Sequence, residues 1–217
     1  MRPPPKIFVI LVNWNGKKDT LECLASLACV KEPSFQTVIV DNGSWDGSVE
    51  TIRNKFPDVP IIETKANLGF AGGNNVGIEW ALSKGAEWLF LLNNDTTVDP
   101  DILQSFLDAA AKEPKGKIFG AKIYRYDQPH VIDHFGGFWN PKIAEFESPA
   151  QGKYDDGSYE EMASADYVCG AALFMHGSVV KTIGLLEPRF FLFWEETDLC
   201  TRAKNAGIEV WAAPKAK

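Results

Sequence analysis

Four short runs of hydrophobic residues divide the first half of the chain. They cover residues 7–13, 37–41, 60–64 and 87–93, and each ends on a polar residue. An apolar run of this length, without alternation, is typical of a strand that is buried on both faces of a sheet. We therefore expect four strands of one sheet, of which those over residues 7–13 and 37–41 are buried on both faces.

The segments between these runs carry apolar residues at helical spacing. Helices are predicted over residues 18–28, 49–56 and 72–84, and Asp99-Pro100 is expected to open another, with the aspartate as its cap. Strands that alternate with helices indicate an α/β fold, with a mostly parallel, Rossmann-like sheet and helices on both faces. In such sheets, ligands bind beyond the carboxyl ends of the strands.

The pattern changes after residue 115. Strands or ribbons are expected over residues 117–126, 130–139 and 166–175, a loop over 148–158, and helices over 177–183 and 199–206. We therefore expect one domain over residues 1–217. In it, residues 1–115 form one half, and residues 116–217 form a second half with a smaller mixed β region.

Polar residues gather where the expected strands of the first half end. In chain order they are Asn13, Asn15, Asp41, Asn42, Asn67, Gly72, Asn74, Asn75, Asn93, Asn94 and Asp95. Because the carboxyl ends of parallel strands meet at one edge of a sheet, these residues predict a ligand site there.

Composition narrows the choice of ligand. The 217 residues are 45% hydrophobic and 24% charged, with a net charge of −7, which is ordinary for a globular protein. A negative net charge disfavours nucleic acid, whose phosphates are bound by clustered Lys and Arg. A diphosphate can still bind if Mg²⁺ or Mn²⁺ bridges it to a carboxylate.

The sequence also bears on the compartment. Its four cysteines form no CxxC pair, and their apolar surroundings favour reduced core residues over a disulfide. No stretch approaches the ~18 apolar residues of a membrane span, and the first residues contain no signal-peptide core. We expect a cytoplasmic protein and leave open a peripheral attachment to the cytoplasmic face of a membrane. The oligomeric state is not readable.

Three features suit a nucleoside diphosphate, and each has a simpler alternative. Asp95 follows a buried strand and could hold a divalent cation, or it could only start a turn. Asp41 could contact ribose hydroxyls or a base edge, or it could bond the turn that follows. The glycines of residues 67–75 could bring backbone amides to a phosphate, or make a tight turn; Ala71 breaks the dinucleotide fingerprint.

Glu195, Glu196 and Asp198 come at the start of an expected helix. Acids there favour the helix dipole by ~0.3–1 kcal/mol each when exposed, which could suffice for Asp198. The hydrophobic residues 190–194 precede the two glutamates, and such a setting raises the pKa of a carboxyl group and suits a general base. Trp194 could stack on an acceptor sugar, although a core position is the simpler alternative.

The histidines are not expected to form a metal site. His130 and His134 are four residues apart, but neighbouring proline and glycines argue against a helix that would pair them. His176 stands alone, and a structural role is expected for it.

Six motifs in this order resemble the family 2 glycosyltransferases with the GT-A fold, particularly the rhamnosyltransferase-like branch of bacterial polysaccharide synthesis. They are Ile10-Leu-Val-Asn-Trp-Asn15, Val40-Asp-Asn-Gly-Ser-Trp-Asp-Gly-Ser48, Asn67-Leu-Gly-Phe-Ala-Gly-Gly-Asn-Asn75, Leu91-Leu-Asn-Asn-Asp95, Gly170-Ala-Ala-Leu-Phe174 and Phe190-Phe-Leu-Phe-Trp-Glu-Glu-Thr-Asp-Leu-Cys-Thr-Arg202. Each motif alone is weak, but six in family order over nearly the whole chain are specific.

The resemblance implies an inverting, metal-dependent transferase that moves a sugar, rhamnose among the candidates, from a UDP- or dTDP-linked donor to a glycan or lipid-linked acceptor. Residues 1–115 would bind the nucleotide sugar and residues 116–217 the acceptor. Asp41 would contact the nucleoside, while Asp95 and Asn93 would hold Mg²⁺ or Mn²⁺ as a DxD-like motif. Glu196, beside Glu195, would deprotonate the acceptor. The other residues implied are Asn13, Asn15, Asn42, Asn67, Gly72, Asn74, Asn75 and Asn94 for the nucleotide sugar, and Trp194 and Asp198 on the acceptor side.

The sequence departs from the family pattern at three points. Asn93 stands at the first DxD position, which leaves Asp95 as the only acid, and Glu196 stands where the family usually has aspartate. The family usually continues past residues 213–217 into a hydrophobic-x-His segment, so we expect a chain truncated at its C-terminus. A sugar-nucleotide-binding module with weak catalysis is the alternative function.

Overall fold

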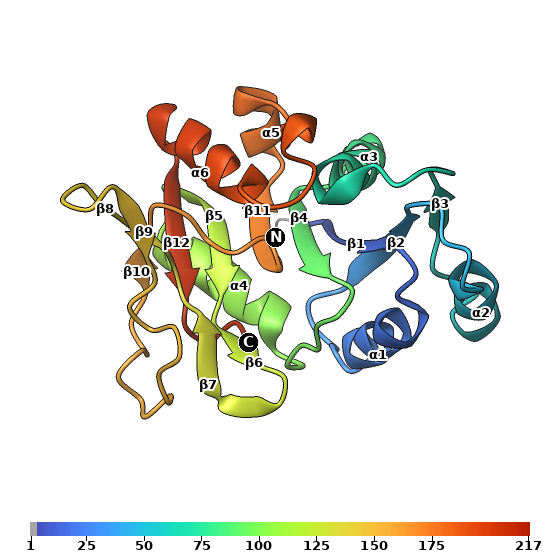
Figure 1. Ribbon diagram of the computed structural model, residues 1–217, viewed down its shortest axis with the longest axis horizontal. Coiled ribbons are helices and arrows are strands. Elements are labelled where there is room, and N and C mark those ends of the chain that lie inside the picture. The colour runs from blue at the N-terminus through green and yellow to red at the C-terminus, as the bar shows by residue number, and fades with distance from the viewer. Residues whose placement is uncertain (1–3) are drawn as a thin grey trace.

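The computed structural model describes residues 4–217, and its centre is an eight-stranded sheet (Figure 1). The strand order is β3-β2-β1-β4-β11-β5-β12-β10. The parallel strands are β1 (Ile7–Asn13), β2 (Phe35–Asp41), β3 (Ile61–Glu63), β4 (Trp88–Asn93), β5 (Gly116–Ala121) and β12 (Glu209–Ala213). Two strands run antiparallel to them, β11 (Ala172–His176) and β10 (Ala163–Ser164). The predicted mostly parallel sheet is confirmed.

Helices cover both faces of the sheet (Figure 1). One face carries α1 (Lys17–Leu27), α2 (Ser48–Lys55) and α4 (Ile102–Lys112), and the other carries α3 (Gly69–Ser83), α5 (Ser178–Ile183) and α6 (Glu195–Asn205). Among residues 4–217, no helix is long and apolar enough to cross a membrane.

The register of the central strands aligns their carboxyl ends. β1 lies between β2 and β4, so Asn13 is opposite Asp41 and Val12 is opposite Asn93. The apolar run of each of these strands therefore ends at nearly the same level of the sheet. The predicted meeting of the polar motifs at one edge of the sheet follows from this register.

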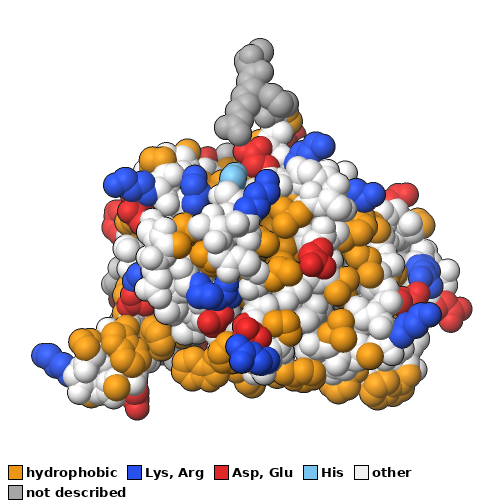
Figure 2. All heavy atoms as spheres, turned by 90° about the horizontal axis from the view of Figure 1, so that it is seen from above, with side chains coloured by type: hydrophobic (Ala, Val, Ile, Leu, Met, Phe, Trp, Pro, Cys, Tyr) orange, Lys and Arg blue, Asp and Glu red, His pale blue; other side chains and the backbone are white. Residues whose placement is uncertain are grey.

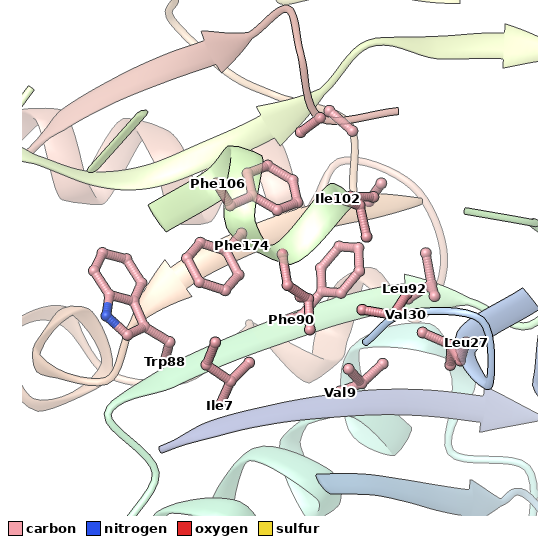
Figure 3. Close-up of a cluster of buried hydrophobic side chains, with 14 of the residues drawn as sticks. Ile7, Val9, Leu27, Val30, Trp88, Phe90, Leu92, Ile102, Phe106 and Phe174 are labelled. Atoms are coloured by element: carbon pink, nitrogen blue, oxygen red, sulfur yellow. The ribbon is translucent and has the colours of Figure 1, made fainter. Parts of the chain in front are cut away.

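Aromatic packing under α4 holds the middle of the sheet rigid. The ring of Phe174 on β11 stacks between Phe106 of α4, at a centroid distance of 4.8 Å, and Trp88 of β4, at 4.7 Å (Figure 3). Phe90 packs edge-on against Phe106. Truncating such a buried ring to alanine costs about 3–5 kcal/mol. The strands that carry the polar edge therefore have little freedom to move.

Two small hairpins lie outside the main sheet and form the expected mixed β region. The first pairs β6 (Ile123–Arg125) with β7 (Gln128–His134), and the second pairs β8 (Phe138–Asn140) with β9 (Glu145–Glu147). A short 3₁₀ helix, η1 (Pro188–Phe190), precedes α6. In Figure 1 the β8–β9 hairpin projects at the left of the molecule.

Three expectations about these elements are wrong. The strand expected over residues 166–175 begins only at Ala172, because Tyr167 instead bridges to Gly137 outside the main sheet. The cap of α4 is Asp101 rather than Asp99, and its side chain makes no capping hydrogen bond. Not every cysteine is a core residue, since Cys29 is exposed. The expectation for the N-terminus concerns, in part, residues 1–3, which lie outside the described residues.

Candidate active site

A buried hydrogen-bond network joins the carboxyl ends of the central strands. The amide nitrogen of Asn13 donates to Asp41 Oδ1 at 2.7 Å and to Ser44 Oγ at 3.0 Å. Its carbonyl oxygen accepts from Thr20 Oγ1 at 2.9 Å, and Thr20 in turn accepts from the side chain of Asn94 at 2.8 Å. Asn13 is fully buried. Its side chain therefore holds Asp41 in place, and its binding of a nucleotide sugar stays a prediction.

Asp41 and Asn42 link the end of β2 to the start of α3. Asp41 is 2% exposed, and its second oxygen accepts the backbone amide of Ser44 at 2.9 Å, so the turn-acid interpretation is observed. Asn42 donates to the carbonyl of Gly69 at 2.9 Å, while Asn67 accepts the amide of Gly69 at the same distance. A carboxylate oxygen accepts more than one hydrogen bond, so Asp41 retains the capacity to accept one from a ribose hydroxyl.

Three predicted residues are engaged with the backbone instead. Asn15 accepts the amide of Trp45 at 2.9 Å. Asn74 donates to the carbonyl of Phe70, and Asn75 bonds both backbone groups of Leu186, at 2.8 and 3.0 Å. Gly72 lies inside α3, where an added Cβ would come 2.8 Å from Leu68 Cβ. These contacts place the residues around the site as supports, and their binding of a nucleotide sugar stays a prediction.

A cleft of about 220 Å³ lies above this network, between the strand ends and α3. Of the predicted residues, it brings together Asn42, Asn67, Asn93, Asn94 and Asp95. Trp14 lines the cleft as well, and so does Phe191, which comes from the segment before α6. The sequence motifs of the first half therefore converge on one cavity, with a contribution from the second half that no motif spacing indicated.

The residues present suit a cation that is shared with a substrate. Asp95 is exposed at the cleft, and Asn93 lies beside it. Among residues 4–217, no group of three or more His, Cys, Asp or Glu side chains is placed to hold a metal ion. Mg²⁺ and Mn²⁺ accept oxygen ligands, and Mg²⁺ commonly takes one or two carboxylates with the rest from phosphates and water. One carboxylate and one amide oxygen fit that mode, but not a cation held by protein alone.

Residues 190–194, here called the strap, connect the cleft to the two glutamates. The carbonyl of Phe191 accepts the amide of Phe70, the second residue of α3, at 2.7 Å. Gly69 permits this approach, because a Cβ there would lie 2.4 Å from the Phe191 oxygen and its φ is +71°. Phe191, Phe193 and Trp194 all have positive φ, which costs about 1–3 kcal/mol for each residue.

Trp194 is 59% exposed, so the core interpretation of this residue is wrong. The left-handed backbone of the strap turns its indole outward, immediately before α6 begins. Exposure leaves the acceptor-side role of Trp194 as a prediction.

Glu195 and Glu196 begin α6, and burial raises the pKa of both carboxyl groups. The negative charge of Glu196 raises the pKa of Glu195 further, whereas backbone amides, including that of Gly170, oppose the rise at Glu196. The Oε2 atom of each glutamate is buried without a hydrogen-bond partner. A buried acceptor of this kind costs about 1–3 kcal/mol, and a ligand hydroxyl that reached either oxygen would relieve that cost.

Gly170 is a site residue that the motif analysis did not single out. Its backbone amide counteracts the rise in the pKa of the Glu196 carboxyl. A Cβ at this position would lie 3.2 Å from the ring of Phe70 and 3.6 Å from Glu196 Cβ. The only sequence signal was the glycine that opens the Gly170–Phe174 motif, because a glycine there allows a close backbone approach.

Asp198 has a structural partner within α6. It pairs with Arg202 at 2.8 Å, and the guanidinium of Arg202 also donates to the carbonyls of Ile183 and Leu185. Asp198 thereby orients the arginine that ties α6 to the chain after α5. The helix-start explanation therefore accounts for its position, and a contact with the acceptor stays a prediction.

Comparison with known proteins identifies the family. The sequence profile described as "Glycosyl transferase family 2" matches residues 8–177. An N-acetylglucosaminyl-diphospho-decaprenol L-rhamnosyltransferase of Mycobacterium tuberculosis is 26% identical, with coverage of 92% of this chain and 70% of the relative. The dTDP-rhamnosyl transferase RfbF of Shigella flexneri is 22% identical, with coverage of 97% and 67%.

A solved structure supports the fold. The mannosyltransferase PcManGT from Pyrobaculum calidifontis, in complex with GDP-Man and Mn²⁺, superposes with a TM-score of 0.68 at 15% identity, over 98% of this chain and 55% of that one. The predicted GT-A fold and the resemblance to rhamnosyltransferases are confirmed. The profile match over residues 8–177, and the convergence of the six motifs on one edge of the sheet, show that the chain belongs to glycosyl transferase family 2.

Proposed function

We propose that this chain is a metal-dependent, inverting glycosyltransferase that uses a UDP- or dTDP-linked sugar. One observation carries the proposal. The carbonyl of Ala171 accepts the amide of Asn93 at 2.9 Å, and the neighbouring Gly170 lies against Glu196, because a Cβ at Gly170 would be 3.6 Å from Glu196 Cβ. Two consecutive residues thus tie the expected general base to the end of β4, where Asp95 lies. A general base and a cation ligand are needed together where a sugar is transferred from a diphosphate.

The proposed reaction follows from the positions of Glu196 and Asp95. Glu196 takes the proton of an acceptor hydroxyl as the oxygen forms its bond to the anomeric carbon. The bond from that carbon to the diphosphate oxygen breaks, and its electron pair leaves with the nucleoside diphosphate. A divalent cation bound at Asp95 would neutralise the negative charge of the leaving diphosphate. Attack opposite the leaving group inverts the anomeric configuration.

The burial of Glu196 suits this role. A base must be ionised before it accepts a proton, and its strength rises with its pKa, so a glutamate with a raised pKa works best near neutral pH. The partnerless Oε2 atom is the natural position for the incoming proton. Gly170 holds the carboxyl group in its orientation without a side chain that would block the acceptor.

The relatives suggest the substrates. Two of them are named as rhamnosyltransferases, one acting on a lipid-linked diphosphate sugar. We therefore propose a deoxyhexose such as rhamnose as the transferred sugar and a glycan or lipid-linked sugar as the acceptor. The proposed cytoplasmic location comes from the sequence rather than from the relatives. We also propose a role in cell-surface polysaccharide synthesis, which the resemblance of the sequence motifs implies.

Calorimetry with UDP and dTDP, each with and without Mn²⁺, tests nucleotide and metal together. We expect binding that Mn²⁺ strengthens, and loss of this Mn²⁺ effect in Asp95→Asn. Asp101→Asn is the matched control, because Asp101 is also exposed but lies outside the cleft. Equal Mn²⁺ dependence in both variants would show that Asp95 does not hold the cation.

Turnover is tested by release of nucleoside diphosphate from UDP- and dTDP-sugars in the presence of octyl glycosides. We expect acceptor-dependent release with inverted product, which NMR of the anomeric proton measures. Binding of the nucleotide without release for any acceptor would instead favour the sugar-nucleotide-binding module.

A further inference from the structure

Four aromatic side chains from separate segments form a continuous surface in the second half of the chain. The ring of Phe146 on β9 lies 5.1 Å from Trp139 of β8, 5.0 Å from Tyr167 and 6.4 Å from Trp194. Trp139 is 46% exposed and Trp194 is 59% exposed. We call Trp139, Phe146, Tyr167 and Trp194 the aromatic platform. Its centre is partly buried, and its two tryptophans remain open to solvent.

The platform begins at the expected general base. Trp194 directly precedes Glu195, and the negative charge of Glu196 contributes to the raised pKa of Tyr167, after burial and Cys169. The buried Oε2 atoms of both glutamates lack a partner in this region. A ligand on Trp194 therefore lies beside the start of α6, where both glutamates stand.

The surroundings of the platform select a neutral ligand. Glu145 and Glu147 adjoin Phe146 in β9, so their exposed side chains lie on the opposite face of the hairpin from its ring. Asp166, which accepts the backbone amide of Trp139 at 2.7 Å, is neutralised by an ion pair with Lys204. The net charge of −7 repels anionic lipid headgroups. Figure 2 shows hydrophobic side chains at the left, at the base of the lobe that corresponds to the β8–β9 hairpin. An exposed apolar patch rimmed by polar groups marks a ligand or partner site.

A pyranose matches both the aromatic surface of the platform and its preference for a neutral ligand. One face of its ring presents C–H groups, which pack on the negative face of an aromatic ring, while its hydroxyls point outward to polar groups. The distances indicate an order: Trp194 adjoins the glutamates, and Trp139 is reached from Trp194 across Phe146. The series of ring contacts from Trp194 through Phe146 to Trp139 therefore offers room for two successive sugar units.

We propose that the aromatic platform is the acceptor subsite, in which Trp194 stacks on the accepting sugar and Trp139 on the sugar unit next to it. The occupant is a neutral glycan of pyranose units, and its hydroxyl meets Glu196. This inference rests on the proposed function and adds to it the class of acceptor and the residues that select its length.

Variants of the β8–β9 hairpin test the inference. Trp139→Leu removes the aromatic face, Trp139→Phe keeps one, and Ile143→Ala is the matched control, because Ile143 is exposed on the same hairpin but outside the platform. With octyl glycosides of a disaccharide we expect Trp139→Leu to raise the acceptor KM roughly tenfold, as for the loss of one aromatic contact. With the corresponding monosaccharide we expect less than a twofold change. Trp139→Phe should retain most of the disaccharide affinity.

Direct binding separates this inference from the proposed function. Saturation-transfer NMR with a methyl disaccharide detects C–H contacts with the platform even if no sugar is transferred. We expect a signal from the second sugar unit that is lost in Trp139→Leu and kept in Ile143→Ala. The same signal in both variants overturns the inference while leaving nucleotide binding intact. Binding to neutral phosphatidylcholine vesicles that depends on Trp139, with no sugar signal, also overturns it, since the platform would then contact membrane.

Discussion

The two halves of the molecule satisfy their buried polar groups differently. In residues 4–115, buried side chains such as those of Asn13, Asp41 and Asn75 are all hydrogen-bonded within the protein. The described side chains with buried polar atoms that lack a partner are His134, Glu195 and Glu196, all in the second half. The same half holds the aromatic strap with its left-handed backbone.

This difference indicates how each half meets its ligand. A saturated network fixes the geometry of the first half before anything binds, because moving one member would break several hydrogen bonds. In the second half, unpaired oxygens and strained residues store free energy that an acceptor can recover on binding. We therefore expect substitutions in the first half to affect stability most, and those in the second half to affect turnover.

The largest expected effect concerns Glu196. Glu196→Gln removes the proton acceptor at nearly constant volume, and we expect turnover to fall roughly 10²–10⁴-fold, the usual contribution of a general base. Calorimetric affinity for UDP or dTDP with Mn²⁺ should stay unchanged, because we propose that residues of the first half bind the nucleotide. The opposite pattern, full turnover in Glu196→Gln and none in Glu195→Gln, would assign the base to Glu195.

The second prediction breaks the network of the first half. Asn13→Ala leaves Asp41 and Thr20 without their buried partner, and we expect the free energy of unfolding to drop by about 2–4 kcal/mol. Urea denaturation followed by circular dichroism measures it. Asn140→Ala, which removes an exposed hydrogen bond to Glu147 in the second half, should change stability by less than about 0.5 kcal/mol. Equal losses would remove the contrast between the halves.

The third prediction uses His134, whose pKa burial lowers to about 4. The unfolded chain binds a proton near the ordinary value of 6.5, so the stability from this group is present above pH 6.5 and is lost as pH falls toward 4. We expect a loss of about 2 kcal/mol between pH 8 and pH 5 from this residue alone. Denaturation of His134→Leu should lack this component, while His130→Leu, at an exposed position, should retain it.

The smallest expected effect is in the pH profile of turnover. Because burial raises the pKa of Glu196, kcat/KM should begin to fall at a pH above the ordinary glutamate value of 4.5 as the solution is acidified. The base is lost by protonation, so the acidic side is the side affected. An acid limb at or below pH 4.5 would contradict a buried base.

Much of this architecture was predictable from local patterns. The strand over Ile7–Asn13 has the bounds that its apolar run indicated, and the first half alternates strand and helix as predicted. These elements are read well because a strand buried on both faces must be apolar throughout. The second half was read less well, since β12 was not predicted and β11 is shorter than expected. Its short hairpins depend on contacts between distant segments.

The same division applies to the site. Residue type and order indicated which side chains are candidates for the chemistry: Asp41, Asp95, Glu195 and Glu196 stand in recognisable motifs. Only the tertiary structure decided their surroundings. It shows that Asn75 supports a loop, that Trp194 faces solvent, and that Gly170 contacts Glu196. Burial and hydrogen-bond partners arise from residues far apart in the chain, so no local pattern contains them.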